Sequence, residues 1–201
     1  MSNKIRILCI GNSHTAGYPF FDPVYGGNVE SSYEYWLNLH LTKTYPNSSF
    51  ALENQGICGQ GSSEVFIRLK TLLTIKEYEI IVYWAGANDI AIGYSIESIW
   101  QNLWNAYRFA KEKKTGFILV TIPPMDWHEI DRIIIKLNEM IISNSNDTYF
   151  CANVYPELED KRRLKSDYDV GDGVHLSVDG YQLVGKVIFN AISRYLDSKS
   201  V

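Results

Sequence analysis

The sequence contains a serine, an aspartate and a histidine, three residue types that together can catalyse acyl transfer. Ser13 lies between Gly11 and Gly17, directly after an apolar run, and Asp172 precedes His175 by three residues in a turn that contains glycine. A serine hydroxyl becomes a good nucleophile when a histidine removes its proton and a carboxylate orients that histidine. The spacing predicts Ser13 as nucleophile, His175 as its base and Asp172 as the partner of His175 Nδ1.

Each of these signals also has a purely structural interpretation. A serine after a strand commonly caps a helix or bonds the amides of a turn, and an aspartate and a histidine before a helix can do the same. The glycines around Ser13 form neither a GxGxxG nor a GxxxxGK[ST] pattern, so the sequence gives no fingerprint of dinucleotide or phosphate binding.

Two further loops offer hydrogen-bond donors for an oxyanion, which acyl transfer requires. Residues 54–63, NQGICGQGSS, are rich in glycine and offer unhindered backbone N–H groups. Residues 85–89, AGAND, offer the side-chain amide of Asn88. Glycine and asparagine are ordinary turn residues, so these loops gain their meaning from occurring together with the serine and the Asp-His pair.

The elements that must position these residues follow from the apolar pattern. Short apolar runs without clear alternation, typical of strands buried on both faces, alternate with segments of helical spacing. The predicted strands are Ile5–Ile10, Phe50–Leu52, Ile80–Trp84, Phe117–Ile122 and Tyr149–Ala152, and the last predicted helix is Val178–Leu196. This order predicts one α/β domain over residues 1–201, a three-layer α/β/α sandwich with a five-stranded, mostly parallel sheet of flavodoxin-like type. Ligands of such sheets bind outside the carboxyl ends of the strands.

In order, four segments resemble the sequence blocks of the SGNH hydrolases, also called the GDSL lipase/esterase family. They are a GDSxxxG-like block at Gly11–Gly17, an NxxxxG-like block at Asn54–Gly59, a GxND block at Gly86–Asp89 and a DxxH block at Asp172–His175. The resemblance spans nearly the whole chain. It implies the SGNH hydrolase fold, a catalytic triad of Ser13, His175 and Asp172, and an oxyanion hole formed by the backbone N–H groups of Ser13 and Gly59 and the side-chain amide of Asn88.

One residue departs from the family pattern, because Asn12 stands where the family usually has aspartate. Asparagine keeps the shape and one acceptor oxygen but has no negative charge. We still expect activity, since no group with an assigned catalytic role is lost. The neighbours of the predicted triad, Asn12, His14, Tyr18 and Val174, are candidate substrate-binding residues, and the aromatic loop of residues 17–28 should border the serine.

The expected activity is hydrolysis of carboxylic esters, with short acyl or O-acetyl groups favoured, through an acyl-enzyme on Ser13 and without metal or organic cofactor. The substrate would be a small-molecule or carbohydrate ester in a shallow cleft, because the chain has no insertion large enough for a lid. Three alternatives remain open. One is an acyltransferase that uses the same triad, and another is a non-catalytic carbohydrate-binding or scaffolding protein of the same fold, for which Asn12 is the hint. The third is a flavodoxin-like nucleotide or flavin binder, which would share the architecture but for which the sequence has no phosphate-binding motif.

Composition excludes several other classes of protein. The formal net charge is −4 and basic residues are not clustered, so nucleic acid is not an expected partner. The apolar run near the N-terminus is too short for a signal peptide, and no run is long enough for stable membrane insertion, so we expect a cytoplasmic protein. The three cysteines form no CxxC pair and are expected to be small buried thiols. The sequence leaves the oligomeric state open.

Overall fold

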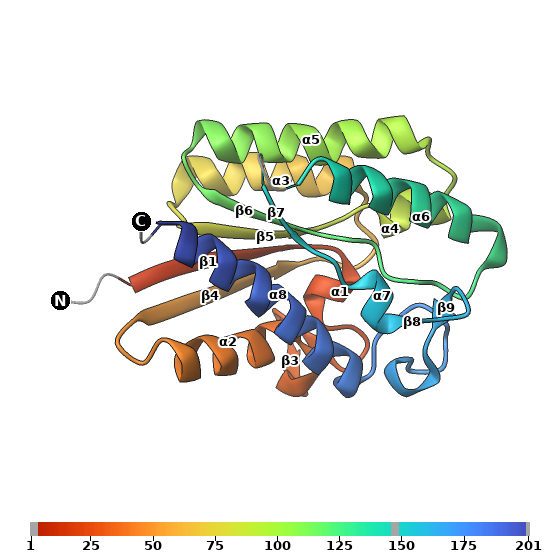
Figure 1. The fold of residues 1–201 in the computed structure, drawn as a ribbon, viewed down its shortest axis with the longest axis horizontal. Coiled ribbons are helices and arrows are strands. Elements are labelled where there is room, and N and C mark those ends of the chain that lie inside the picture. Colours follow the sequence, from red (N-terminus) through yellow and green to blue (C-terminus); the bar gives the residue numbers. More distant parts are fainter. Residues whose placement is uncertain (1–3, 146–148, 200–201) are drawn as a thin grey trace.

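A central parallel sheet organises the chain. The computed structural model describes residues 4–145 and 149–199 and has three layers, with helices on both sides of the sheet (Figure 1). The strands of this sheet are, in chain order, β1 (Lys4–Gly11), β4 (Ser49–Gly56), β5 (Ile80–Trp84), β6 (Gly116–Val120) and β7 (Phe150–Ala152). Their spatial order is β4-β1-β5-β6-β7, and every pairing is parallel. The predicted sandwich is therefore confirmed, with a sheet that is wholly parallel.

Helices from different parts of the chain cover the two faces of the sheet. One face carries α3 (Ser62–Ile75), α5 (Ile96–Glu112) and α6 (His128–Ser143), which lie together along the upper side of Figure 1. The opposite face carries α2 (Tyr33–Thr44) and α8 (Val178–Lys199). Connections between parallel strands must cross over the sheet, and the helices that make them bury both of its faces.

Alternate residues of the central strands enter two separate cores. On β1, Leu8 and Ile10 pack with the α3, α5 and α6 side, whereas Ile7 and Cys9 pack with α2 and α8. All four side chains are fully buried. Because the residues that face either side of the sheet are apolar, the strand appears in the sequence as a continuous apolar run.

The structure extends one predicted strand, β4, well beyond its apolar part. The apolar run predicts Phe50–Leu52, but β4 continues through Glu53, Asn54 and Gln55 to Gly56 and pairs with β1 over its full length. Its residues up to Gln55 are only partly buried, because β4 is an edge strand with one neighbour. An edge strand can carry polar side chains that the centre of the sheet would exclude.

Short elements fill the connections. They are α1 (Ser13–Ala16), β2 (Phe21–Asp22), β3 (Gly26–Gly27), a 3₁₀ turn at Val29–Ser31, α4 (Ala87–Ala91), α7 (Tyr155–Leu158), β8 (Glu159–Asp160), β9 (Arg163–Leu164) and a 3₁₀ turn at Ser166–Tyr168. The pairs β2–β3 and β8–β9 are small antiparallel hairpins that the apolar pattern did not predict. Strands of two residues are too short to show periodicity.

The strands that follow β1 in the chain are added first on one side of β1, as β4, and then on the other side, as β5. From β1 the chain passes to β4 on one side and then returns to β5 on the other, so the loops after β1 and β5 diverge. At such a switch point the carboxyl ends of neighbouring strands border an open crevice. Ser13 follows β1 and Asn88 follows β5, so the topology brings these two predicted site residues to the carboxyl ends of neighbouring strands.

Other expectations from composition are partly changed by the structure. Cys9 is buried and Cys151 is half-buried, but Cys58 is exposed, which corrects the prediction of three buried thiols. Cys58 is exposed because it lies in a surface loop after the end of β4.

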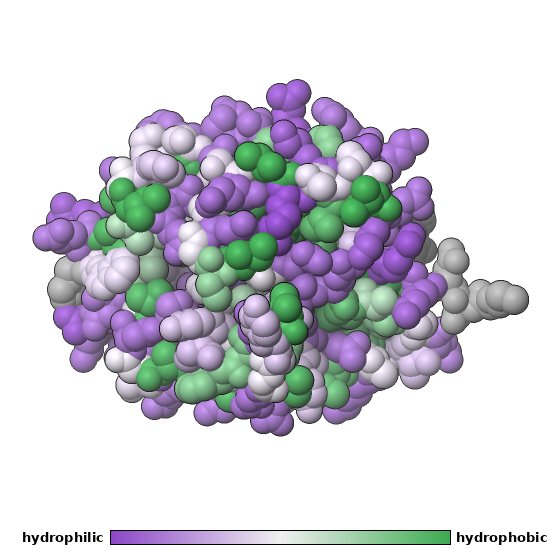
Figure 2. All heavy atoms as spheres, turned by 180° about the vertical axis from the view of Figure 1, so that it is seen from behind, coloured by the Kyte–Doolittle hydropathy of each residue, from purple (hydrophilic) through white to green (hydrophobic). Residues whose placement is uncertain are grey.

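No helix within residues 4–145 or 149–199 is long and apolar enough to cross a membrane. On the face shown in Figure 2, hydrophobic side chains occur in small groups among hydrophilic ones.

An acidic side chain is buried at the start of α2. Glu34 is 7% exposed, and one of its carboxyl oxygens accepts a hydrogen bond of 2.6 Å from the Ser32 hydroxyl. Burial raises the pKa of Glu34 to about 8. The hydrogen bond from Ser32 lowers the pKa but offsets only part of the effect of burial. Glu34 is therefore largely protonated in the folded protein at neutral pH.

This raised pKa predicts a stability that falls as pH rises. The folded state holds the Glu34 proton up to about pH 8, whereas the unfolded chain releases it near 4.5. The stabilisation present below pH 4.5 is therefore lost progressively between these values, by up to about 5 kcal/mol at ~1.4 kcal/mol per pKa unit. Urea unfolding at several pH values should show this slope. Glu34→Gln should flatten it and the exposed Glu112→Gln should not; equal slopes in all three proteins would contradict the assignment.

Candidate active site

Ser13 begins the short helix α1 directly after β1. The side chain of Asn12 caps this helix by accepting a hydrogen bond of 3.1 Å from the His14 N–H. At the other end, Gly17 adopts a left-handed conformation with φ 96° and its N–H bonds the Ser13 carbonyl. Asn12 thus provides the acceptor oxygen that an aspartate would provide, so the departure from the family pattern leaves this turn intact.

A tight loop before α8 carries Asp172 and His175. Gly171 and Gly173 both have positive φ, 103° and 74°, which favours glycine at these positions. One carboxyl oxygen of Asp169 accepts hydrogen bonds from the N–H groups of both glycines, at 2.8 and 3.0 Å. The loop is therefore held by its own backbone and by Asp169, a residue that the sequence analysis did not single out.

The three predicted triad residues form a continuous path of hydrogen bonds. His175 Nδ1 lies 2.6 Å from Asp172 Oδ2, and His175 Nε2 lies 3.2 Å from Ser13 Oγ. A carboxylate only accepts hydrogen bonds, so Nδ1 of the neutral ring carries the proton and Nε2 presents its lone pair to the serine hydroxyl. This arrangement can remove a proton from Ser13 and hold the resulting imidazolium against Asp172.

Hydrogen bonds keep Asp172 ionised although its side chain is only partly exposed to water. Partial burial would raise the pKa of Asp172, but bonds from the backbone and ring of His175 and from the Val174 N–H outweigh it and hold the pKa below its usual value. The two backbone bonds go to Asp172 Oδ1, at 2.9 Å from Val174 N and 2.8 Å from His175 N. Asp172 thus binds the imidazole with one oxygen and the loop with the other.

Two of the three predicted oxyanion donors, Gly59 and Asn88, lie in loops that bond each other. Asn88 Nδ2 donates a hydrogen bond of 2.9 Å to the Gln60 carbonyl, next to Gly59. One N–H of this amide group is thereby used and the second is available to a ligand. Among the described residues, the backbone N–H groups of Ser13 and Gly59 donate no hydrogen bond within the protein. Such free donors suit a site where negative charge develops.

Asp89 and Ser62 hold the Asn88 loop. The fully buried Asp89 accepts hydrogen bonds of 2.7 Å from both the backbone N–H and the hydroxyl of Ser62, at the start of α3. A carboxylate at a helix N-terminus is stabilised by the unpaired N–H groups there. Asp89 is therefore a structural residue that fixes α4 and, with it, the neighbouring Asn88.

Arg68 of α3 joins several of the strand ends and was missed by the sequence analysis. Its guanidinium donates to the carbonyls of Gly11, at 3.0 Å, and Gln55, and Arg68 Nε bonds the Gln60 side chain at 3.0 Å. These contacts tie the ends of β1 and β4 to the loop that carries Gly59. Within the helical pattern, Arg68 had no signal that distinguished it from a surface residue.

The four candidate substrate-binding residues differ in their exposure. Asn12 and His14 are each 1% exposed, and their side chains bond protein atoms. The His14 ring lies against the rings of Trp84 and His175. Tyr18 is 43% exposed, and its ring centroid lies 4.5 Å from that of His175. Val174 is half-buried beside His175.

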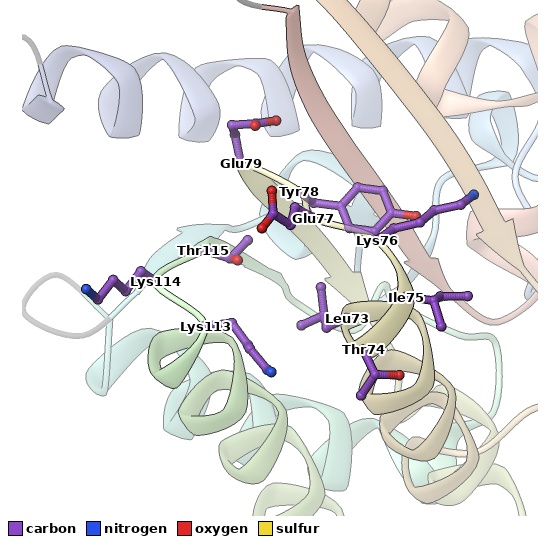
Figure 3. Close-up of a pocket in the computed structure, with 10 residues that line it drawn as sticks. All are labelled: Leu73, Thr74, Ile75, Lys76, Glu77, Tyr78, Glu79, Lys113, Lys114 and Thr115. Carbon is purple, nitrogen blue, oxygen red and sulfur yellow. The ribbon is translucent and has the colours of Figure 1, made fainter.

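A sizeable pocket lies at the amino ends of the strands, opposite the end that carries Ser13, and no triad residue lines it. This pocket, of about 640 Å³, is lined by residues 73–79 and 113–115, which come before β5 and β6 (Figure 3). Its side chains are of both charges, including Lys76, Glu77 and Lys113. The carboxyl ends of the strands, where Ser13 lies, are the expected place for chemistry in this fold, so we assign the site by its residues and not by cavity size.

A match to a known protein family decides the family to which this chain belongs. Residues 9–183 match the family model of the GDSL-like lipase/acylhydrolase family. The chain belongs to this family. The resemblance of its four sequence blocks is thereby confirmed, and the acylhydrolase is one of the carboxylic ester hydrolases. No curated protein matches the sequence.

Solved structures of the family share the fold of this acylhydrolase at low sequence identity. A single-residue variant of an acetyl-xylooligosaccharide esterase from a Geobacillus species has a TM-score of 0.78 at 18% identity, over 96% of this chain and 95% of the other. The psychrotrophic esterase EstA from Pseudoalteromonas sp. has a TM-score of 0.72 at 21% identity, over 96% and 98%. A member of the G-D-S-L lipolytic family from Veillonella parvula has 0.74 at 17% identity, over 94% and 99%.

Two glycines next to the site should respond differently to substitution. A Cβ on Gly56 would lie 2.0 Å from the Ala16 backbone nitrogen in α1, whereas a Cβ on Gly59 would meet no atom within 4 Å but would be strained by a φ of 79°. Gly56→Ala should lower the free energy of unfolding by about 3 kcal/mol or more through overpacking. Gly59→Ala should cost about 1 to 2 kcal/mol through backbone strain.

Urea unfolding of the two variants beside the wild type measures both effects. Wild-type stability of Gly56→Ala would show that α1 does not rest directly on the end of β4.

Proposed function

We propose that this acylhydrolase cleaves short-chain acyl or O-acetyl esters of small molecules or carbohydrates through an acyl-enzyme on Ser13. The observation that carries the proposal is the path of hydrogen bonds from Asp172 through His175 to Ser13. Ser13 lies near the N-terminal end of the sequence, and Asp172 and His175 lie near its C-terminal end. Each of them could serve a local structural role, as a helix cap or a turn residue, without the others. Their convergence at one point has no structural need, which favours a catalytic role.

Acylation begins with attack of Ser13 Oγ on the ester carbonyl carbon. His175 Nε2 takes the hydroxyl proton as the new C–O bond forms, and the carbonyl oxygen becomes an oxyanion. The imidazolium then gives this proton to the alcohol oxygen as the ester C–O bond breaks. Asp172 stays ionised throughout and stabilises the imidazolium, in agreement with its lowered pKa.

The oxyanion is stabilised by donors that are already in place. The Ser13 and Gly59 backbone N–H groups and the second N–H of Asn88 are the proposed donors. In the second half of the reaction His175 takes a proton from water, the hydroxide attacks the acyl carbon, and Ser13 leaves with the proton returned by His175. Atoms and charge balance with water as the sole co-reactant, so the chain's own residues suffice for the cycle.

Exposed aromatic side chains at the Ser13 end of the sheet support a sugar ester as substrate. The Tyr18 ring stands beside His175, and the exposed Phe20, Ile57 and Trp127 follow β1, β4 and β6 at the same edge of the sheet. Exposed aromatic rings can stack on a sugar ring. The structural neighbour named as an acetyl-xylooligosaccharide esterase acts, by its title, on such a compound, which supports carbohydrate acetyl esters as the first class to test.

Hydrolysis of p-nitrophenyl esters from acetyl to dodecanoyl tests the proposal. The wild type should turn over acetyl and butyryl esters fastest, and Ser13→Ala should reduce turnover by at least about 10³-fold, as for loss of other triad nucleophiles. Rates that rise steadily with chain length would contradict the short-acyl preference. Background rates in both proteins would favour the non-catalytic carbohydrate-binding alternative. Acyl transfer to an added sugar alcohol in preference to water would favour the transferase alternative.

The oxyanion assignment of Asn88 has its own test. Asn88→Ala should lower kcat on the order of a hundredfold, because a preorganised donor to the oxyanion is lost. Asn88→Asp should lose at least as much, since it keeps the shape but replaces the donor by a negative charge. The exposed Asn38→Ala on α2 serves as the control. Unchanged kcat in a variant that retains its Tm would remove Asn88 from the oxyanion hole.

A further inference from the structure

The residue after the proposed nucleophile has no role in the reaction described so far. His14 is 1% exposed, and its ring lies between Trp84 and His175, with centroid distances of 5.1 and 5.7 Å. His14 Nε2 lies 3.0 Å from the carbonyl oxygen of Val174. A buried histidine beside the catalytic base, bonded to the loop that carries that base, calls for an explanation beyond packing.

The contact with Val174 fixes the protonation of His14. A carbonyl oxygen only accepts hydrogen bonds, so His14 Nε2 must carry a hydrogen. Burial lowers the pKa of His14 to about 4, although the bond to Val174 acts in the opposite direction. The ring is therefore neutral at neutral pH, with its one proton on Nε2. A neutral ring also avoids placing a second positive charge beside the imidazolium that forms on His175 during catalysis.

The bonded carbonyl belongs to the peptide unit that leads into His175. In this unit the Val174 C=O accepts from His14 Nε2, and the His175 N–H donates to Asp172 Oδ1 at 2.8 Å. The C=O and N–H of a trans peptide point in opposite directions, so these two bonds hold the peptide plane from both sides. The His175 Cα is part of this peptide unit, so a displacement of the unit would move the Cα and, with it, the imidazole relative to Ser13.

We propose that His14 is a positioning residue that sets the orientation of the catalytic base through the Val174–His175 peptide. This inference rests on the proposed function, in which His175 is the base for Ser13. Because His14 directly follows Ser13, the nucleophile and the tether of the base are fixed by one helical turn. The 3.2 Å contact between His175 Nε2 and Ser13 Oγ then depends on two neighbouring residues of α1.

Two substitutions separate the hydrogen bond from the volume of the side chain. His14→Leu fills similar space but has no donor, whereas His14→Gln can place an amide N–H near the position of Nε2. His14→Leu should lower kcat by about ten- to a hundredfold, as expected for a misplaced catalytic group, with KM changed less than about twofold. His14→Gln should recover most of the loss. Leu41→Ala, a buried substitution in α2, controls for reduced stability and should leave kcat unchanged.

A spectroscopic readout follows the base directly. In ¹⁵N-histidine-labelled protein, the proton between His175 Nδ1 and Asp172 should give a downfield resonance, which His14→Leu should shift or broaden and His14→Gln should restore. Wild-type kcat in His14→Leu, or equal losses in the Leu and Gln variants, would overturn the proposal. If His14→Leu does not fold, the ¹⁵N shifts of the wild type decide: a proton on His14 Nε2 supports the tether, and a proton on Nδ1 overturns it.

The Ser13→Ala variant shows whether a negative result concerns the role of His14 or the proposed hydrolase activity. If wild-type turnover does not exceed that of Ser13→Ala, the proposed hydrolase activity fails. The response of the His175 resonance to His14→Leu and His14→Gln then still decides whether His14 positions the ring.

Discussion

The contact between His175 Nε2 and Ser13 Oγ joins two segments that are 162 residues apart in the chain, and the rest of the site depends on it. Neither segment can provide the contact alone. The sheet order places β1 between β4 and β5, with its carboxyl end at the switch point. The loop before α8 contacts α1 through the bonds of His175 to Ser13 and of Val174 to His14. A hydrogen bond of this kind tolerates displacements of only a few tenths of an ångström, so the fold must hold both ends.

The surrounding polar contacts are arranged to meet that requirement. A charged side chain bonds each active loop: Arg68 of α3 holds the ends of β1 and β4, Asp89 holds the Asn88 loop to α3, and Asp169 holds the glycines on either side of Asp172. All these bonds have a charged partner, which makes them stronger than bonds between neutral groups. Positioning through charged side chains leaves the backbone N–H groups of Ser13 and Gly59 without an acceptor in the described part of the chain, as the proposed oxyanion hole requires.

The fold could be predicted from the sequence, and the predicted triad residues lie within hydrogen-bond distance of one another. The burial and the contacts of several other residues could not be predicted. Runs such as Ile80–Trp84 are apolar on both faces, so a parallel sheet was evident without tertiary information. The end of β4 was missed because an edge position, and not residue type, permits Glu53 and Asn54 in a strand. Burial of His14 and Glu34 was also not evident, because it results from packing of α1 and α2 against the sheet and runs against the usual preference of both residue types. Arg68 was missed for a similar reason, since its partners are backbone carbonyls.

The most direct test of the account is mass spectrometry after reaction with an activated fluorophosphonate, which captures a serine that an adjacent base has made nucleophilic. The account predicts a single adduct on the peptide that contains Ser13, formed at least about 10²-fold more slowly in a His175→Ala variant because the base is absent. Adducts that form on other serines, such as Ser177, or labelling of Ser13 at an equal rate in the variant would contradict the assignment of Ser13 and His175 as nucleophile and base.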